Sequence, residues 1–306
     1  MSVLVELPIE EYAETAFADF TPMAGFNIGT ARAMAWMSQL AYETRWPEKI
    51  DRVGRMWGLD SIRPFDAPTQ SVLPLSDTRG IVATNRRATI IAFAGTDPLN
   101  LPNWISDFYL GRSDADIHKG FRDAAATVWP DVGTVIQTCA ESNRQIFIVG
   151  HSLGAAIAIV TADRASSERN LRQAEIYVFG APRAGKLNFV NRYNANFGTT
   201  TYRFVHGADI VPTVPPSELE FHHVGRYLHC ERGGKFDPAK LLERPNSDEP
   251  SPGDNLFSGV AQRIRGLFAG PLSPTSRGDA LGQLSQLLAP SIGDHLPDRY
   301  YNALRP

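Results

Sequence analysis

The chain has 306 residues, of which 43% are hydrophobic and 21% are charged, and its formal net charge at pH 7 is -3. This balance is typical of a globular protein with enough apolar residues for a large core. No long run of one charge sign occurs, so a nucleic-acid partner, which requires clustered positive charge, is not expected. The two cysteines, Cys139 and Cys230, lack the spacing of a zinc site, and neither a metal nor a disulfide framework is expected.

The N-terminal twenty residues are rich in glutamate and lack a basic region followed by a long apolar stretch. This pattern argues against a signal peptide. No window approaches the ~20 apolar residues of a membrane-spanning helix, so no transmembrane segment is expected. We therefore expect a soluble protein in the cytoplasm, with export by another route left open.

Helix-like and strand-like patterns alternate along the chain. Their alternation predicts an α/β fold with a mostly parallel central sheet and helices on both faces. A helix is expected over residues 30–43, followed by two strands that a polar hairpin connects, at 80–84 and 89–93. A second helix over about 121–142 contains Pro130, which is expected to kink or split it.

The remaining strands read as apolar runs that are buried on both faces. Helix-sized crossovers separate three of them and predict parallel pairing, at residues 146–149, 175–179 and 200–205. A further strand is expected over residues 219–228.

The pentapeptide Gly-His-Ser-Leu-Gly at residues 150–154 carries the strongest chemical signal, between an apolar strand and an alanine-rich helix. In an α/β hydrolase the nucleophilic serine occupies such a turn, where small neighbours allow a strained backbone. Ser152 is therefore the expected nucleophile, and an ordinary turn with a capping serine is the alternative. Backbone amides for an oxyanion hole are expected from Leu153 and from Thr96, which follows the 89–93 strand.

A serine nucleophile needs a base and a group that orients this base, in the chain order serine, acid, histidine for this fold. Asp209 follows the 200–205 strand and is the expected acid. Among later histidines, His295 on a loop near the C-terminus is favoured over His222 and His223. His151 adjoins the nucleophile, but the turn is expected to direct its ring away. Two further histidines precede the acid and are expected to be structural, namely His118 and His206.

Several motifs occur in a fixed order from about residue 30 to the end, namely LAYE, FAGTD, NWISDF, HKGF, GHSLG, FGAPRAG, HGADIVPTVPP and DHLPDRYY. With these motifs the chain resembles the class 3 lipase family. The resemblance implies an α/β-hydrolase-type domain over residues 1–306, with Ser152, Asp209 and His295 as a triad. It assigns Thr96 and Leu153 to the oxyanion hole.

By the same resemblance, residues 97–110 correspond to a short lid over the acyl pocket. Its apolar side chains are expected to bind substrate, namely Leu99, Leu101, Trp104, Ile105 and Phe108. An apolar patch of this kind suits a lid that opens at a lipid interface. The alternative is a helix packed permanently on the core.

Residues 231–290 differ in sequence pattern from the rest of the chain, because loops rich in glycine and proline flank apolar residues at helical spacing. We interpret this stretch as a loop and helical segment inserted within the single domain. Its amphipathic part, residues 255–272, is interpreted as plain helix packing, with a second cover or a lipid-facing surface as the alternative.

The expected function is a serine carboxylic-ester hydrolase that works through an acyl-enzyme, without a cofactor, as a lipase on acylglycerols. Its partners would be an uncharged ester or lipid and a transient lipid interface. Three alternatives stay open: an esterase for soluble or aromatic esters, an acyl transferase, and a non-catalytic lipid-binding protein on a hydrolase fold.

Overall fold

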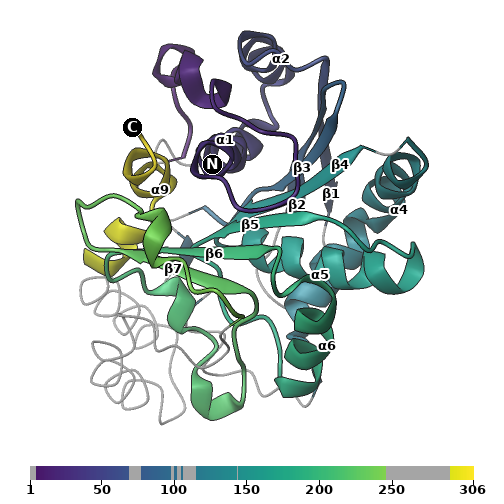
Figure 1. Cartoon of the computed structure of the whole chain (residues 1–306), viewed down its shortest axis with the longest axis vertical. Helices are drawn as coiled ribbons and strands as arrows, with labels where there is room; N and C mark the ends of the chain where they lie inside the picture. The colour runs from purple at the N-terminus through teal and green to yellow at the C-terminus, as the bar shows by residue number, and fades with distance from the viewer. Residues whose placement is uncertain are drawn as a thin grey trace, which may run out of the picture.

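The computed structural model describes residues 5–68, 77–97, 100–101, 105, 115–142, 144–245 and 290–306. In this part of the chain a seven-stranded sheet lies between two layers of helices (Figure 1). The strands follow one another across the sheet in chain order, from β1 to β7.

The sheet has an antiparallel edge and a parallel body. The antiparallel edge comprises β1 (Ser61–Pro68), β2 (Asp77–Thr84) and β3 (Ala88–Phe93). The parallel body continues from β3 through β4 (Gln145–His151), β5 (Glu175–Phe179), β6 (Thr201–His206) and β7 (Arg226–Cys230). This arrangement confirms the predicted hairpin and the mostly parallel sheet. Because parallel strands end at the same edge, the segments that follow β3 to β6 are brought together there.

The crossover helices cover one face of the sheet. They are α4 (Lys119–Ser142), α5 (Leu153–Glu168) and α6 (Leu187–Phe197). When successive parallel strands lie side by side, right-handed crossovers place every connecting helix on the same face. Figure 1 shows the three helices together on this side. The expected split at Pro130 does not occur, since α4 continues through it. Because proline has no N–H, the carbonyl four residues earlier in the helix loses its usual partner. Pro130 is exposed, so water can bind that carbonyl instead.

The opposite face is covered by helices from the two ends of the described chain. They are α1 (Ile28–Leu40), α2 (Pro47–Met56) and α9 (Pro297–Ala303). α1 begins earlier than expected because the Asn27 side chain caps it, accepting a hydrogen bond from the amide of Thr30 at 2.8 Å. Figure 1 shows α9 beside α1. The rings of Trp36 and Tyr301 stack there at 3.9 Å, and Arg32 Nε donates to the carbonyl of Leu304 at 2.8 Å.

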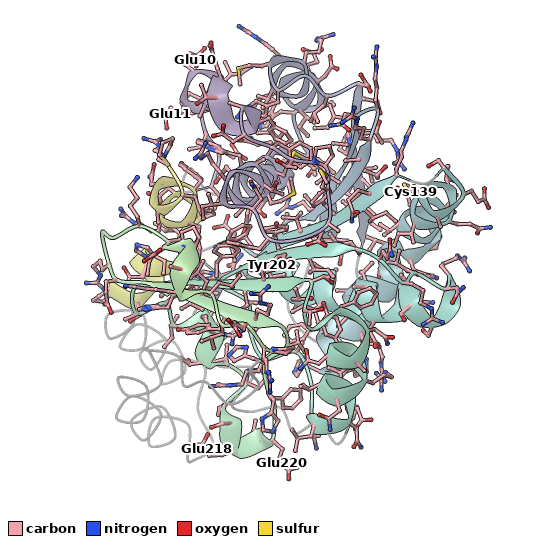
Figure 2. The ribbon with its side chains drawn as sticks, in the orientation of Figure 1. Glu10, Glu11, Cys139, Tyr202, Glu218 and Glu220 are labelled. Carbon is pink, nitrogen blue, oxygen red and sulfur yellow. The ribbon has the colours of Figure 1, made fainter. Side chains whose placement is uncertain are left out.

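The core has two layers because successive side chains of a strand point to opposite faces. Ile91 and Ile148 pack in the layer of α4 and α5, whereas Ile90 and Phe147 pack in the layer of α1. Figure 2 labels Tyr202 on β6, which belongs to the α1 layer. All of β3 and nearly all of β4 are buried, which explains their continuous apolar sequences.

The predicted strand over residues 219–228 is wrong in its position, since β7 begins at Arg226. Glu220 adopts a left-handed conformation at φ 61° and Gly225 has φ +75°, so the chain turns before it enters the sheet. His222 and His223 consequently precede the strand, and only His229 lies on it. β1 has no counterpart among the expected strands.

Two predicted segments fall largely outside the described residues. Of the candidate lid, the structure describes Asp97, residues 100–101 and Ile105. Of the inserted segment, it describes residues 231–245 and Pro290. In the part of the chain that is described, no helix is both long and apolar enough to cross a bilayer.

Candidate active site

Ser152 occupies a strained turn between β4 and α5. Its backbone has φ 61° and ψ -130°, a conformation that is rare for a residue with a side chain. The amide of Ser152 donates to the carbonyl of Phe179 on β5 at 2.9 Å, which fixes the turn to the neighbouring strand. The predicted strand-to-helix turn is therefore present at this position.

The glycines on both sides of Ser152 are required by close backbone packing. A Cβ on Gly150 would lie 2.5 Å from the amide of Ala155 and even closer to the carbonyl of Gly154. A Cβ on Gly154 would lie 2.7 Å from the carbonyl of Ala94, with that of Phe93 nearer still. The end of β3 is thus pressed against the first turn of α5.

This packing brings the two expected oxyanion positions to the same place. Gly95 leaves no room for a side chain, because its Cβ would lie 2.8 Å from the Cβ of Ser152. Thr96 follows it, and its Oγ1 is buried without a hydrogen-bond partner among the described residues. Leu153 is the first residue of α5, where backbone N–H groups lack partners within the helix and the helix dipole favours negative charge. The site could therefore accommodate a developing oxyanion.

Asp209 and His295 form a buried pair. Nδ1 of His295 donates to Oδ2 of Asp209 at 2.8 Å, and both residues are at most 1% exposed. The carboxylate accepts two further hydrogen bonds, from the amide of Val211 at 2.8 Å and from the hydroxyl of Tyr300. Because Nδ1 carries the proton, Nε2 of a neutral His295 is free to accept one.

The hydroxyl of Ser152 and Nε2 of His295 share an unusual property. Both atoms are buried, and neither has a hydrogen-bond partner within the described residues. Buried polar atoms without partners are costly and rare, and they concentrate at functional sites. Such atoms are the donor and acceptor that a proton transfer between serine and histidine requires.

The end of β5 also confines the acid–histidine pair. Gly180 has φ +57°, and a Cβ there would lie 2.7 Å from Oδ2 of Asp209 and 2.9 Å from Nδ1 of His295. Gly180 is the second residue of the FGAPRAG motif, and the lack of space for a side chain explains the glycine at this position. Three strand ends, those of β4, β5 and β6, thereby surround the pair.

His151 has a closer connection to the site than the sequence indicated. Its Nε2–H donates to the carbonyl of His295 at 2.7 Å, so its Nδ1 accepts from the hydroxyl of Tyr42 at 2.8 Å. The two imidazole rings stack with centroids 4.5 Å apart. Burial, and the neighbouring His295, lower the pKa of His151 well below its usual value, which keeps the ring neutral. His151 therefore supports the backbone of His295.

The alternative histidines bind other groups. Nε2 of His223 donates to the carbonyl of Pro212 at 2.9 Å, and Nε2 of His229 donates to that of Gly207 at 3.0 Å. Burial lowers the pKa of His118 to about 4, and His118 packs against aromatic rings at the start of α4. Among the described residues, His295 is the histidine that the structure bonds to Asp209.

Two residues of the DHLPDRYY motif contribute contacts that sequence reasoning missed. The hydroxyl of Tyr300 donates a hydrogen bond to Asp209. Asp294 is buried, and Arg232 donates to it from Nε at 2.8 Å and from Nη2 at 2.7 Å. Asp294 and Tyr300 are close to His295 in sequence, which is the feature that could have drawn attention to them. Nothing in the sequence identified the residues that they contact.

The candidate lid is described at two of its five named side chains. Leu101 is 1% exposed and Ile105 is fully buried, and both belong to the core layer of α4 and α5. The other three lie outside the described residues, namely Leu99, Trp104 and Phe108. Among the described residues, no group of three or more histidine, cysteine or carboxylate side chains could bind a metal ion.

Comparison with known proteins gives a consistent result. A family model described as lipase (class 3) matches residues 90–219. A secreted mono- and diacylglycerol lipase of Fusarium solani is 30% identical over 164 residues, which cover 51% of this chain and 48% of that protein. One of Malassezia globosa is 31% identical over 158 residues, covering 45% and 50% of the respective chains.

The matched region spans about half the length of these curated relatives. A solved structure of a triacylglycerol lipase, described as having a serine protease triad at its catalytic centre, is similar over a longer range. It is 26% identical with a TM-score of 0.56, and the match covers 77% of this chain and 91% of that one. The structural similarity confirms the expected α/β-hydrolase-type fold.

The expected cytoplasmic location is wrong. It depended on the absence of a signal-peptide pattern in the N-terminal residues, whereas the relatives from Fusarium solani and Malassezia globosa are named secreted lipases.

Proposed function

The chain belongs to the class 3 lipase family, and from this premise we propose that it hydrolyses carboxylic esters of acylglycerols through an acyl-enzyme on Ser152. One observation carries the proposal. The buried Ser152 hydroxyl and Nε2 of His295 each lack a hydrogen-bond partner in the described chain, while Nδ1 of His295 is bonded to Asp209 at 2.8 Å. This is the arrangement of a nucleophile, a base and an orienting acid.

In the first half of the reaction, Oγ of Ser152 attacks the ester carbonyl carbon and passes its proton to Nε2 of His295. Asp209 stabilises the resulting imidazolium, supported by the Tyr300 hydroxyl and the Val211 amide. The tetrahedral intermediate then expels the alcohol, which takes the proton from Nε2. The product of this half is an ester between the acyl group and Ser152.

In the second half, water replaces the alcohol. His295 takes a proton from the water molecule, the hydroxyl attacks the acyl carbon, and the bond to Ser152 breaks as the proton returns to Oγ. The products are a carboxylic acid and the original enzyme. In both halves the backbone amides of Thr96 and Leu153 would stabilise the oxyanion, and the loss of one such donor typically lowers kcat by about 100- to 1,000-fold.

Acylglycerols are the proposed substrate class for two reasons. The relatives are named mono-, di- and triacylglycerol lipases. Leu101 and Ile105 of the candidate lid are buried apolar side chains, and a neutral apolar substrate could replace their contacts with the core if the segment moved. Activity on an emulsified triglyceride should rise abruptly as its concentration passes the solubility limit. Smooth saturation below that limit would instead assign the protein to the esterases.

The chemical step is tested with Ser152→Ala. The wild type should hydrolyse a p-nitrophenyl ester and be labelled once by a fluorophosphonate, and the variant should show neither property. Its thermal unfolding should remain cooperative. Hydrolysis or labelling that persists in the folded variant would refute the assignment of the nucleophile.

A further inference from the structure

An ion pair lies directly beside the proposed base. Asp294, the residue before His295, is 3% exposed and accepts hydrogen bonds from Nε and Nη2 of Arg232, which follows β7. The Arg232 side chain itself is 58% exposed. A bidentate contact of this kind fixes the orientation of the carboxylate as well as its position.

The same carboxylate binds the loop that carries Asp209. The amide of Ala208 donates to Oδ2 of Asp294 at 2.9 Å. Gly207, at φ +54°, has no room for a side chain, because a Cβ would lie 2.6 Å from Oδ2 of Asp294. The loop backbone therefore passes directly over the carboxylate. Asp294 joins the segment with the proposed base to the loop with the proposed acid.

His295 needs such support from outside its own segment. His295 does not lie on a loop as expected, because residues 290–295 are helical, and Leu296 separates them from α9. Arg232 and Asp294 are separated by 62 positions in sequence, so local sequence does not set the distance between them. Bringing such distant segments together costs conformational entropy, which the contacts at the closing point must offset. In the described chain these contacts include those of Asp294, of the His295 carbonyl and of His295 Nδ1, and a hydrogen bond from Nη2 of Arg232 to the carbonyl of Pro290 at 3.4 Å.

We propose that Arg232 is a positioning residue for His295, acting through Asp294 to keep Nδ1 of His295 bonded to Asp209. The inference rests on the proposed ester hydrolysis at Ser152. A guanidinium that only stabilised the fold would leave the chemical step unchanged. One that fixes the base lowers kcat when it is removed, because small displacements of a catalytic group can cost up to about 100-fold in rate.

Arg232→Gln is a suitable variant. The side chain is largely exposed and borders a cavity of about 430 Å³, so a smaller residue fits without a clash. We expect kcat for a p-nitrophenyl ester to fall about 10-fold or more. KM should change by less than about twofold, because no substrate contact is altered. Arg232→Lys keeps the charge but loses the fork of donors, so it should recover only part of the rate.

Arg63→Gln provides the matched control. Arg63 also makes a bidentate pair, with Asp131 at 2.8 and 3.0 Å, and its side chain is 50% exposed, but it lies on β1 and contacts α4. Its loss should leave kcat unchanged. Asp294→Asn should lower kcat as Arg232→Gln does, and the double variant should be no worse than the stronger single one, because both act through one contact.

A spectroscopic readout separates this inference from the proposed function. The Nδ1 proton of His295 in its bond to Asp209 should give a downfield NMR signal, which disappears in His295→Gln. That signal should broaden through faster exchange in Arg232→Gln and persist in Arg63→Gln. A full kcat together with an unchanged signal in Arg232→Gln would overturn the positioning role. If the wild type hydrolysed no ester, the proposed function would fail, and the signal would still decide whether Arg232 orders His295.

Discussion

The turn around Ser152 and the segment around His295 are fixed in contrasting ways. The turn is fixed by close packing of backbone, since Gly150 packs against the first turn of α5 and Gly154 packs against the end of β3. The His295 segment is fixed by residues far along the chain. Asp209 is 86 positions away, and His151 is 144 positions away.

The difference shows how strain and mobility are divided in the site. The strained backbone of Ser152, the proposed nucleophile, persists because the first turn of α5 and the end of β3 pack closely against it. In the proposed mechanism His295 gains and loses a proton, and it is oriented by side-chain hydrogen bonds, such as the one to Asp209. Substitutions in the first region should therefore affect folding, whereas those in the second should affect turnover.

The strongest test of the second region is Asp209→Asn. The amide can no longer stabilise the imidazolium of His295 and can favour the wrong tautomer, so kcat should fall by about 10⁴-fold. Ester hydrolysis measures the loss, and thermal unfolding should show a folded protein. Asp163→Asn, which removes an ion pair with Arg192 on the helical face, is the control and should keep its activity. Only a small decrease of kcat in Asp209→Asn would contradict the view that substitutions in the His295 region act on turnover.

Gly154→Ala tests the first region. The new methyl group would meet the carbonyls of Phe93 and Ala94, which are backbone atoms that cannot rotate away. We expect the free energy of unfolding to fall by about 3 kcal/mol. The control is Gly293→Ala in the His295 segment, where a Cβ has no heavy atom within 4 Å. Urea denaturation of both variants measures the two free energies of unfolding. Equal values would contradict the inference that rigid backbone packing holds the turn around Ser152.

Acid should destabilise the whole domain, because burial lowers the pKa of four histidines, namely His118, His151, His206 and His223. A lowered pKa means that the unfolded chain binds protons that the folded chain does not, so stability is lost as pH falls below about 6.5. His118 has a folded pKa of about 4 and should contribute about 2 kcal/mol of this loss between pH 7 and pH 5.

His118→Gln should reduce the pH dependence of stability by that amount. Urea denaturation at a series of pH values provides the measurement. A slope unchanged from the wild type would show that His118 does not resist protonation in the folded state. His118 lies outside both regions of the site. The substitution therefore measures the effect of acid on stability independently of catalysis.

Tyr300→Phe gives the smallest expected effect. It removes one donor from the Asp209 carboxylate while the ring keeps its packing, and a hydrogen bond to a charged group contributes about 1.5 kcal/mol or somewhat more. We expect a decrease in kcat of about 10-fold with little change in KM. Steady-state kinetics at pH 8 would reveal it. A loss of stability without any change in kcat would show that Tyr300 stabilises the fold and does not support Asp209 in the reaction.

Sequence reasoning performed well where structure is local. The apolar run of β4 and the glycines around Ser152 lie within ten residues, and they predicted the strand, the turn and the helix. Asp209 was proposed as the acid because it follows a recognisable strand. The hairpin between β2 and β3 was likewise marked by its polar connection.

The same reasoning missed contacts that tertiary packing creates. The hydroxyl of Tyr300 reaches Asp209 across 91 positions, and Arg232 reaches Asp294 across 62. A tyrosine or arginine with such a partner has no distinguishing pattern in sequence. For His151 the sequence predicted only that the turn directs its ring away from Ser152. The partners that orient its ring, Tyr42 and His295, lie on other elements.

The packing of α9 against α1 has a consequence for the order of folding. Arg32 and Leu304 are 272 positions apart, and contacts across such separations form slowly because a long chain must first be closed. The strands β3 to β6 can pair through shorter connections. During refolding, the burial of Trp36 beneath Tyr301 should therefore coincide with the recovery of esterase activity, and both should follow the formation of the sheet. We therefore expect the packing of α9 against α1 to determine when His295 reaches Asp209.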